Sequence, residues 1–238
     1  AADFLMPLYA LNKYSSQANG GDFTVVSLND NGVGGSGIYL GKKDEFYTTD
    51  LLHPVTPDSP AGYRYTLSNM TVELTKGLTD SVYGGEISGE GSVTKTGDGI
   101  LALSGANTYT GATNVNAGSF ALTGSLQSPV TVANGATFTG YGTINGNLNN
   151  SGTLVPGLTA EARNLFYAAS GSSTTTTVPQ VGTLTISGNF TSNGKLIVAA
   201  NGTTSSKLVV GGNSTLTGTS LYLVNGGTNP LLNHKYNY

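Results

Sequence analysis

The sequence contains no cysteine, which excludes disulfide bonds, thiolate metal sites and cysteine nucleophiles. Charged residues are scarce as well, at 10% of the chain against about a quarter in average globular proteins. No stretch approaches the roughly 18 consecutive apolar residues that indicate a membrane-spanning helix. Together these absences argue against an ordinary globular enzyme core and against a helical membrane protein.

The few charges are unevenly distributed along the 238 residues. Residues 1–99 hold twelve of the thirteen acidic residues and six of the ten Lys and Arg residues. Residues 100–238 retain only Glu161, Arg163 and three lysines. The net charge is −3 and no basic cluster is present, so we expect no nucleic-acid partner. The second half of the chain must therefore cover its surface with hydroxyl, amide and backbone groups.

Short apolar alternations separated by Gly and Asn dominate what is present. Residues 97–126 read G-D-G-I-L-A-L-S-G-A-N-T-Y-T-G-A-T-N-V-N-A-G-S-F-A-L-T-G-S-L. Gly and Asn tolerate the positive φ that tight corners need. Strands of three to five residues between such corners are typical of a chain that winds a β-solenoid. The residues expected to mark successive strands are Ile87, Val93, Leu101, Leu103, Val115, Phe120, Leu122, Val130, Val132, Phe138, Ile144, Leu148, Leu154 and Val155.

This run closely resembles the passenger-associated repeat of bacterial type V autotransporters, which has the form G-x-L-x-L-x-G-x-N-T-Y-T-G-x-T-x-V-x-x-G-x-L. The resemblance implies an all-β fold, a right-handed parallel β-helix, on the surface of a Gram-negative bacterium or secreted from it. The family attaches to the membrane through an outer-membrane barrel, and no barrel-length set of alternating segments is recognised here. Many relatives also carry an upstream subtilisin-like protease domain.

The pattern predicts two regions. Residues 1–81 are expected to form an irregular, β-rich N-terminal segment or cap, and residues 82–238 the β-helix repeats. A second resemblance to such passengers, in G-T-L-V-P-G at 152–157 and G-T-L-T-I-S-G at 182–188, is interrupted by residues 158–181. We interpret residues 158–181 as a loop inserted at a corner of the coil. Long inserted loops are often functional, so the candidate interaction residues are Glu161, Arg163, Phe166 and Tyr167.

The search for catalytic and metal-binding groups predicts none. Gly218-Thr219-Ser220 imitates part of the subtilisin nucleophile motif, but its alternating surroundings predict that Ser220 is a strand serine. His53 and His234, the only histidines, are expected to have surface or packing roles. A cation site would draw its carboxylates from Asp44, Glu45 and Asp50. The neighbouring Gly-rich run, however, lacks the aspartate of a calcium-binding repeat. We therefore predict no catalytic residue, no metal and no cofactor.

Two further features bear on partners. Eight of the thirteen tyrosines lie in residues 1–109, and Tyr39, Tyr47, Tyr63 and Tyr65 are candidates for an aromatic binding surface, with Tyr83 as a further member. Covering the end of the coil is the alternative role for these tyrosines. Four segments fit the N-glycosylation sequon, as expected by chance in a chain so rich in Asn and Thr: Asn69-Met70-Thr71, Asn189-Phe190-Thr191, Asn201-Gly202-Thr203 and Asn213-Ser214-Thr215.

The sequence thus predicts a non-catalytic passenger that serves as a β-helical adhesion or interaction scaffold. Its expected partner is a host-cell or matrix protein, a glycan, or another copy of itself. The alternative is a stalk segment of a subtilisin-like serine protease autotransporter whose catalytic domain lies upstream.

Overall fold

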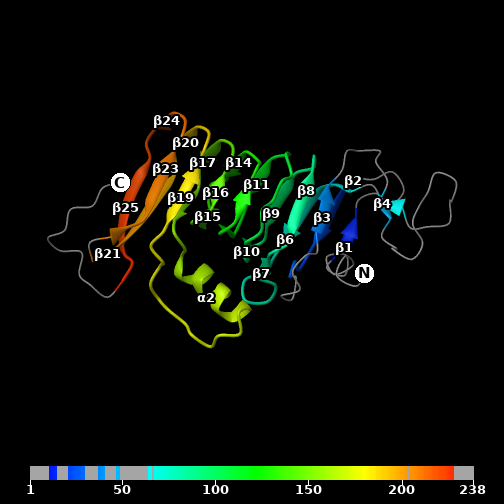
Figure 1. Ribbon diagram of the computed structural model, residues 1–238, viewed down its shortest axis with the longest axis horizontal. Coiled ribbons are helices and arrows are strands. Elements are labelled where there is room, and N and C mark those ends of the chain that lie inside the picture. The colour runs from blue at the N-terminus through cyan, green and yellow to red at the C-terminus, as the bar shows by residue number, and fades with distance from the viewer. Residues whose placement is uncertain are drawn as a thin grey trace.

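The computed structural model describes residues 11–14, 21–29, 37–40, 47–48, 64–65, 67–202 and 204–227. In this part of the chain, three parallel sheets wind around a common core and form an elongated coil (Figure 1). Each turn of the coil adds one strand to each sheet. This is a parallel β-helix, as the sequence predicts.

The first face of the coil is a nine-stranded sheet. Its strands, in spatial order, are β1 (Leu11–Tyr14), β2 (Gly21–Val25), β6 (Leu67–Glu73), β9 (Val93–Thr96), β11 (Thr113–Val115), β14 (Val130–Val132), β17 (Leu148–Asn150), β20 (Phe190–Ser192) and β24 (Ser214–Leu216). All neighbours are parallel except β1 and β2. From β9 to β17, register partners are 20, 17 and 18 residues apart, so one turn takes about that length.

The second face is an eight-stranded sheet. It comprises β22 (Thr204–Ser205), β21 (Lys195–Asn201), β18 (Thr153–Pro156), β15 (Thr137–Gly140), β12 (Ser119–Leu122), β10 (Ile100–Leu103) and β7 (Ser81–Tyr83), with β25 (Ser220–Asn225) also paired to β21. Only β22 is antiparallel to its neighbour.

The third face is interrupted. It contains the pair β3 (Gly37–Leu40) and β8 (Glu86–Gly89) and the four-stranded sheet β13 (Ser125–Leu126), β16 (Thr143–Ile144), β19 (Thr183–Ile186) and β23 (Lys207–Val210). Between these two groups of strands, Ala106 forms an isolated parallel bridge with Ser125 of β13. A separate antiparallel pair joins β4 (Tyr47–Thr48) to β5 (Arg64–Tyr65).

The core is a shaft of stacked apolar side chains. In the eight-stranded sheet, Leu101, Phe120, Phe138 and Leu154 are successive register partners, and all four are fully buried. The rings of Phe120 and Phe138 stack with centroids 5.4 Å apart. Because equivalent residues pair from turn to turn, each apolar side chain is covered above and below by a similar one.

The coil crosses the boundary that the sequence predicts at residue 81. Strand β6 precedes this position and pairs in register with β9 beyond it, and β3 pairs with β8. Met70, Val72 and Leu74 belong to the same buried core as the later turns. The described strands therefore continue the same sheets on both sides of residue 81.

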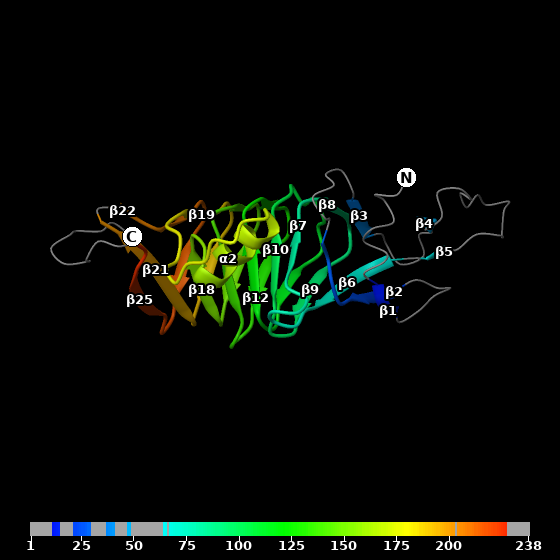
Figure 2. The ribbon, with the colours of Figure 1, turned by 90° about the horizontal axis from the view of Figure 1, so that it is seen from below.

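The insertion contains a helix, α2 (Ala160–Ala169), where the sequence suggested a loop. Seen from below, α2 lies across the strands of the eight-stranded sheet (Figure 2). Within the described residues, no helix has the length and apolar character needed to cross a membrane.

Candidate functional site

The local sequence explains why α2 forms. Thr159 caps the helix, because its Oγ1 accepts a hydrogen bond from the backbone N–H of Ala162 at 3.2 Å. Glu161 adds a negative charge to the first turn, where the helix dipole favours it. The helical residues A-E-A-R-N-L-F-Y-A-A are mostly good helix formers. Gly171, with φ of 80°, takes the left-handed conformation that commonly ends a helix.

α2 docks on a small apolar patch on the outside of the eight-stranded sheet. Ala102 and Ala121 face outward from neighbouring strands, and both are fully buried. Ala162, also fully buried, packs on this patch together with Leu158. Leu165 and Phe166 are partly buried against the same cluster. The small alanine side chains let the helix approach the sheet closely, so the insertion is a fixed part of the fold.

The segment that follows α2 is tied back to the helix. The side chain of Asn164 donates to the backbone oxygen of Thr176 at 2.9 Å and accepts from its N–H at 2.8 Å. The Arg163 guanidinium donates to the Tyr167 hydroxyl at 3.1 Å and to the Val178 carbonyl at 3.4 Å. These bonds make α2 and the return segment, residues 158–181, one module, which we call the helical insertion.

The four predicted interaction residues have different environments. Phe166 packs against the sheet-side cluster, and Arg163 and Tyr167 are half-buried and bonded to each other. Glu161 is exposed. The exposed surface of the helical insertion consists instead of Glu161, Ala168, Ala169, the polar run 170–175 and Thr177. Whether this surface binds a partner stays a prediction.

The predicted aromatic surface lies largely outside the residues with described side chains. Tyr39 is in β3, and Tyr47 and Tyr65 are register partners on β4 and β5. Tyr63 lies outside the described residues. For Tyr83 the prediction of exposure is wrong, because this side chain is fully buried in the core beside the strand partner Leu103.

Lys95 and Tyr109 are ionisable side chains that are buried inside the coil. Lys95 occupies an inward position between Val72 and Val115, and its Nζ donates to the carbonyls of Thr96 and Gly97 at 2.7 and 3.0 Å. Burial lowers the pKa of Lys95 from 10.5 to about 8, although Asp80 and Asp98 act in the opposite direction. Tyr109 bonds the Thr113 hydroxyl at 2.6 Å, and burial raises the pKa of its phenol. Both groups have structural partners, which indicates a structural role.

The outer face of the nine-stranded sheet is polar and uncharged along its central column. Successive register partners, pointing away from the core, are Thr24, Thr71, Thr94, Asn114, Thr131, Asn149, Thr191 and Thr215. We call this column the Thr/Asn ladder. The sequence predicts outward Thr and Asn ladders of this kind, and three of the Asn-x-Thr motifs mark this column. In each, the threonine belongs to the ladder and the asparagine lies two residues earlier.

The described residues contain no constellation of catalytic or metal-binding groups. Ser220 is the exposed first residue of β25, which confirms that it is a strand serine. Within these ranges, no group of three His, Asp or Glu side chains is placed to hold a metal ion. His53, His234, Asp44, Glu45 and Asp50 all lie outside the described residues.

Comparison with known proteins agrees with this geometry. Residues 93–122 match the passenger-associated-transport-repeat family. The match begins at the first residue of β9 and ends at the last residue of β12, so it covers more than one complete turn of the coil. The chain is also 38% identical, over 122 residues, to an extracellular serine protease of Serratia marcescens. That alignment covers 51% of this chain but only 11% of the protease. Together these findings support a fragment of an autotransporter passenger, within which residues 93–122 carry the passenger-associated transport repeat.

Proposed function

We propose that this chain is a non-catalytic β-helical scaffold of an exported passenger, and that it presents its outer surfaces to partners at the cell exterior. The observation that carries the proposal is the family match at 93–122, which coincides with stacked, in-register turns of the coil. A coil of this kind has a mechanical role, because each turn supports the next and holds the surface features at fixed positions.

The two outer surfaces described above are what such a scaffold would present. One is the exposed part of the helical insertion, fixed to the eight-stranded sheet through Ala162. The other is the Thr/Asn ladder on the nine-stranded sheet. An adhesion role is supported by their exposure and by the low charge of residues 100–238, which carry five charged side chains. Adhesion through one of these surfaces would depend on hydrogen bonding and shape more than on charge.

A second candidate function is supported by the similarity to the Serratia marcescens protease. In that case the chain is a stalk that carries a serine protease domain encoded elsewhere in the same precursor. The helical insertion and the ladder would then be structural, and the coil would serve folding and export of the protease.

A display experiment separates the two functions. The precursor is expressed on the bacterial surface with its natural insertion, and in a variant that replaces residues 158–181 by a short Gly-Ser linker. The scaffold proposal expects the precursor to bind immobilised matrix protein or epithelial cells. This binding should be weaker in the linker variant or in variants of the ladder. The stalk proposal expects the same binding by the variant as by the unaltered precursor. It also expects that casein hydrolysis requires the part of the precursor that lies outside this chain. Casein hydrolysis by the purified chain alone would contradict the non-catalytic assignment.

A further inference from the structure

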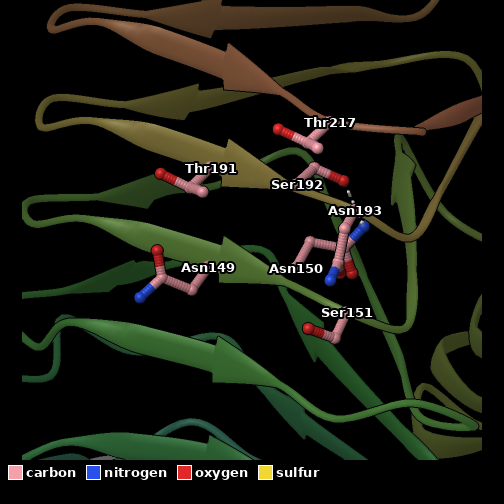
Figure 3. Close-up of a pocket in the computed structure, with 7 residues that line it drawn as sticks. All are labelled: Asn149, Asn150, Ser151, Thr191, Ser192, Asn193 and Thr217. Carbon is pink, nitrogen blue, oxygen red and sulfur yellow. Dashed lines mark hydrogen bonds between the residues drawn. The ribbon is translucent and has the colours of Figure 1, made fainter.

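A polar groove opens on the coil where the nine-stranded sheet turns toward the eight-stranded sheet. It has a volume of about 230 Å³ and crosses the ends of the three successive strands β17, β20 and β24 (Figure 3). Its lining consists entirely of amide and hydroxyl residues, namely Asn149, Asn150, Ser151, Thr191, Ser192, Asn193 and Thr217. We call it the corner groove.

The floor of the corner groove is fixed by internal hydrogen bonds. Asn150 is buried, and its Nδ2 donates to Ser192 Oγ at 3.2 Å and to the Lys195 carbonyl at 3.0 Å. Its Oδ1 accepts from the backbone N–H of Gly152 at 3.1 Å. Ser192 Oγ also accepts from the N–H of Gly194 at 3.3 Å. These inward side chains hold the corner in shape and have little capacity left for a ligand.

The walls differ from the floor. The side chains of Asn149, Ser151, Thr191 and Asn193 are exposed, and none of them hydrogen-bonds another described residue. At the opposite ends of the same strands, an asparagine side chain hydrogen-bonds the backbone of the next turn. There the Oδ1 of Asn147 accepts from the N–H of Asn189 at 2.8 Å. The free hydrogen-bonding capacity of this face is therefore concentrated at the corner groove and along the ladder that leads to it.

The chemistry of the walls selects the class of ligand. Asparagine offers both donors and an acceptor, and a serine or threonine hydroxyl can donate or accept. No charged side chain lines the groove. The next charged residue along the chain, Lys195, has its Nζ 5.9 Å from the ring centroid of Tyr222 on β25. Such a surface suits an uncharged molecule whose own groups both donate and accept, and it has nothing to neutralise an anion.

We propose that the corner groove binds a segment of a neutral oligosaccharide, with the adjoining Thr/Asn ladder contacting further sugar units. Sugar hydroxyls match the donor and acceptor pairs of the walls. Strands repeat about every 4.8 Å along the ladder, so a polymeric ligand meets equivalent groups at each step. This inference rests on the proposed scaffold function and names the class of partner for one of its surfaces. Binding is weak, because each bond replaces one to water.

The test is an NMR titration of the full chain, observed through its backbone and asparagine side-chain amides. The neutral probes are cellohexaose, maltohexaose and chitohexaose, and the anionic probe is a heparin hexasaccharide. We expect at least one neutral probe to shift the side-chain amides of Asn149 and Asn193. The N149A/N193A double variant should lose about tenfold in affinity, since two wall amides are removed. N145A, which removes an exposed asparagine side chain from the turn after β16, outside both the corner groove and the ladder, is the matched control and should bind nearly as the unaltered chain does.

Three results would overturn the proposal: no response to any neutral probe, a response to heparin alone, or equal binding by N149A/N193A and the unaltered chain. Unchanged backbone spectra of the variants outside the groove verify that they are folded. If the displayed precursor binds neither matrix protein nor cells but the titration is positive, the adhesion role is refuted and the sugar site stands. A negative titration with positive display would refute only the sugar site.

Discussion

At the scale of single residues, the coil depends on a few positions where the shaft or a corner admits one kind of side chain. Lys95 is the exception inside the shaft, because its register partners on both sides are valines. A long side chain can place its ammonium at the corner while its methylenes remain in the core. The carbonyls of Thr96, Gly97 and Ala117 then replace water around the charge.

The lowered pKa of Lys95 predicts a specific dependence of stability on pH. Below about pH 8 the lysine is charged in both the folded and the unfolded chain, so the cost of burying the charge is constant. Between about 8 and the unfolded value of 10.5, the unfolded chain binds more protons, and the free energy of unfolding rises with pH. We expect K95M to lose this rise, as measured by urea unfolding at pH 7.5 and 10. The exposed Lys207, changed to methionine, should keep it.

Glycine corners allow a matched comparison. Gly97 and Gly135 both have positive φ, at 74° and 86°. A Cβ at Gly97 would overlap the backbone of Leu74 in the preceding turn, whereas a Cβ at Gly135 meets nothing within 4 Å. G135A should therefore cost only the left-handed backbone term, about 1–2 kcal/mol. G97A should cost clearly more, because the turns must separate. Denaturant unfolding of both variants measures the difference, and equal losses would contradict the stacking argument.

At the scale of elements, the helical insertion shows how one helix can be added to a coil without disturbing it. Register partners Leu148 and Phe190 are 42 residues apart across the insertion, yet β17 and β20 pair like any other neighbours. The chain leaves after β18, packs α2 on the outer alanines, and returns to β19 in register with β16. The added segment costs the coil little, because it leaves and re-enters at a corner.

Docking of α2 is testable by proteolysis. Arg163 is the only Lys or Arg between residues 96 and 194, so trypsin reports on the helix at a single site. In the folded chain this site should resist cleavage. A162E places a carboxylate in the buried contact at a cost of about 2 kcal/mol or more, which should speed cleavage at Arg163 about thirtyfold. A168E, on the exposed side of the same helix, should leave the rate nearly unchanged. Equal rates in all three proteins would mean that the helix is not held by this contact.

At the scale of the whole molecule, stability should vary along the coil. Strands β10, β12 and β15 each have partners on both sides and fully buried inward residues. At the far end, all three residues of β24 are exposed, and Leu221, Tyr222 and Leu223 of β25 are 44–57% exposed. Each turn is stabilised mainly by its neighbours, so a turn with a neighbour on one side only is less stable.

Hydrogen exchange read by mass spectrometry should reveal this gradient. Amides of β10, β12 and β15 are expected to exchange slowest, and those of β24 and β25 considerably faster. We also expect amides of the repeat region to exchange more slowly than those of residues 1–80, and the same measurement tests this. Uniform protection from β6 to β25 would indicate that the coil unfolds as one cooperative unit instead.

Sequence alone was sufficient for the fold class, because a parallel coil repeats its local pattern every turn. The local alternation around Leu101, Phe120 and Phe138 predicts that these side chains point inward, and Gly and Asn predict corners. Neither prediction needs knowledge of long-range contacts. The helix of the insertion was also within reach, since Thr159, Glu161 and the alanines form a recognisable helix start. The interpretation of residues 158–181 as a loop inserted at a corner overlooked this helix start.

Only the tertiary structure decided which polar groups are free. Asn147 and Asn149 are two residues apart and chemically identical, yet one satisfies the backbone of the next turn and the other faces the corner groove. Likewise Tyr83, a candidate for the aromatic surface, is buried in the core. Local pattern specifies the alternation of a strand, but which partner each side chain meets depends on the register between turns. That register joins residues up to 49 positions apart, beyond the range of any local signal.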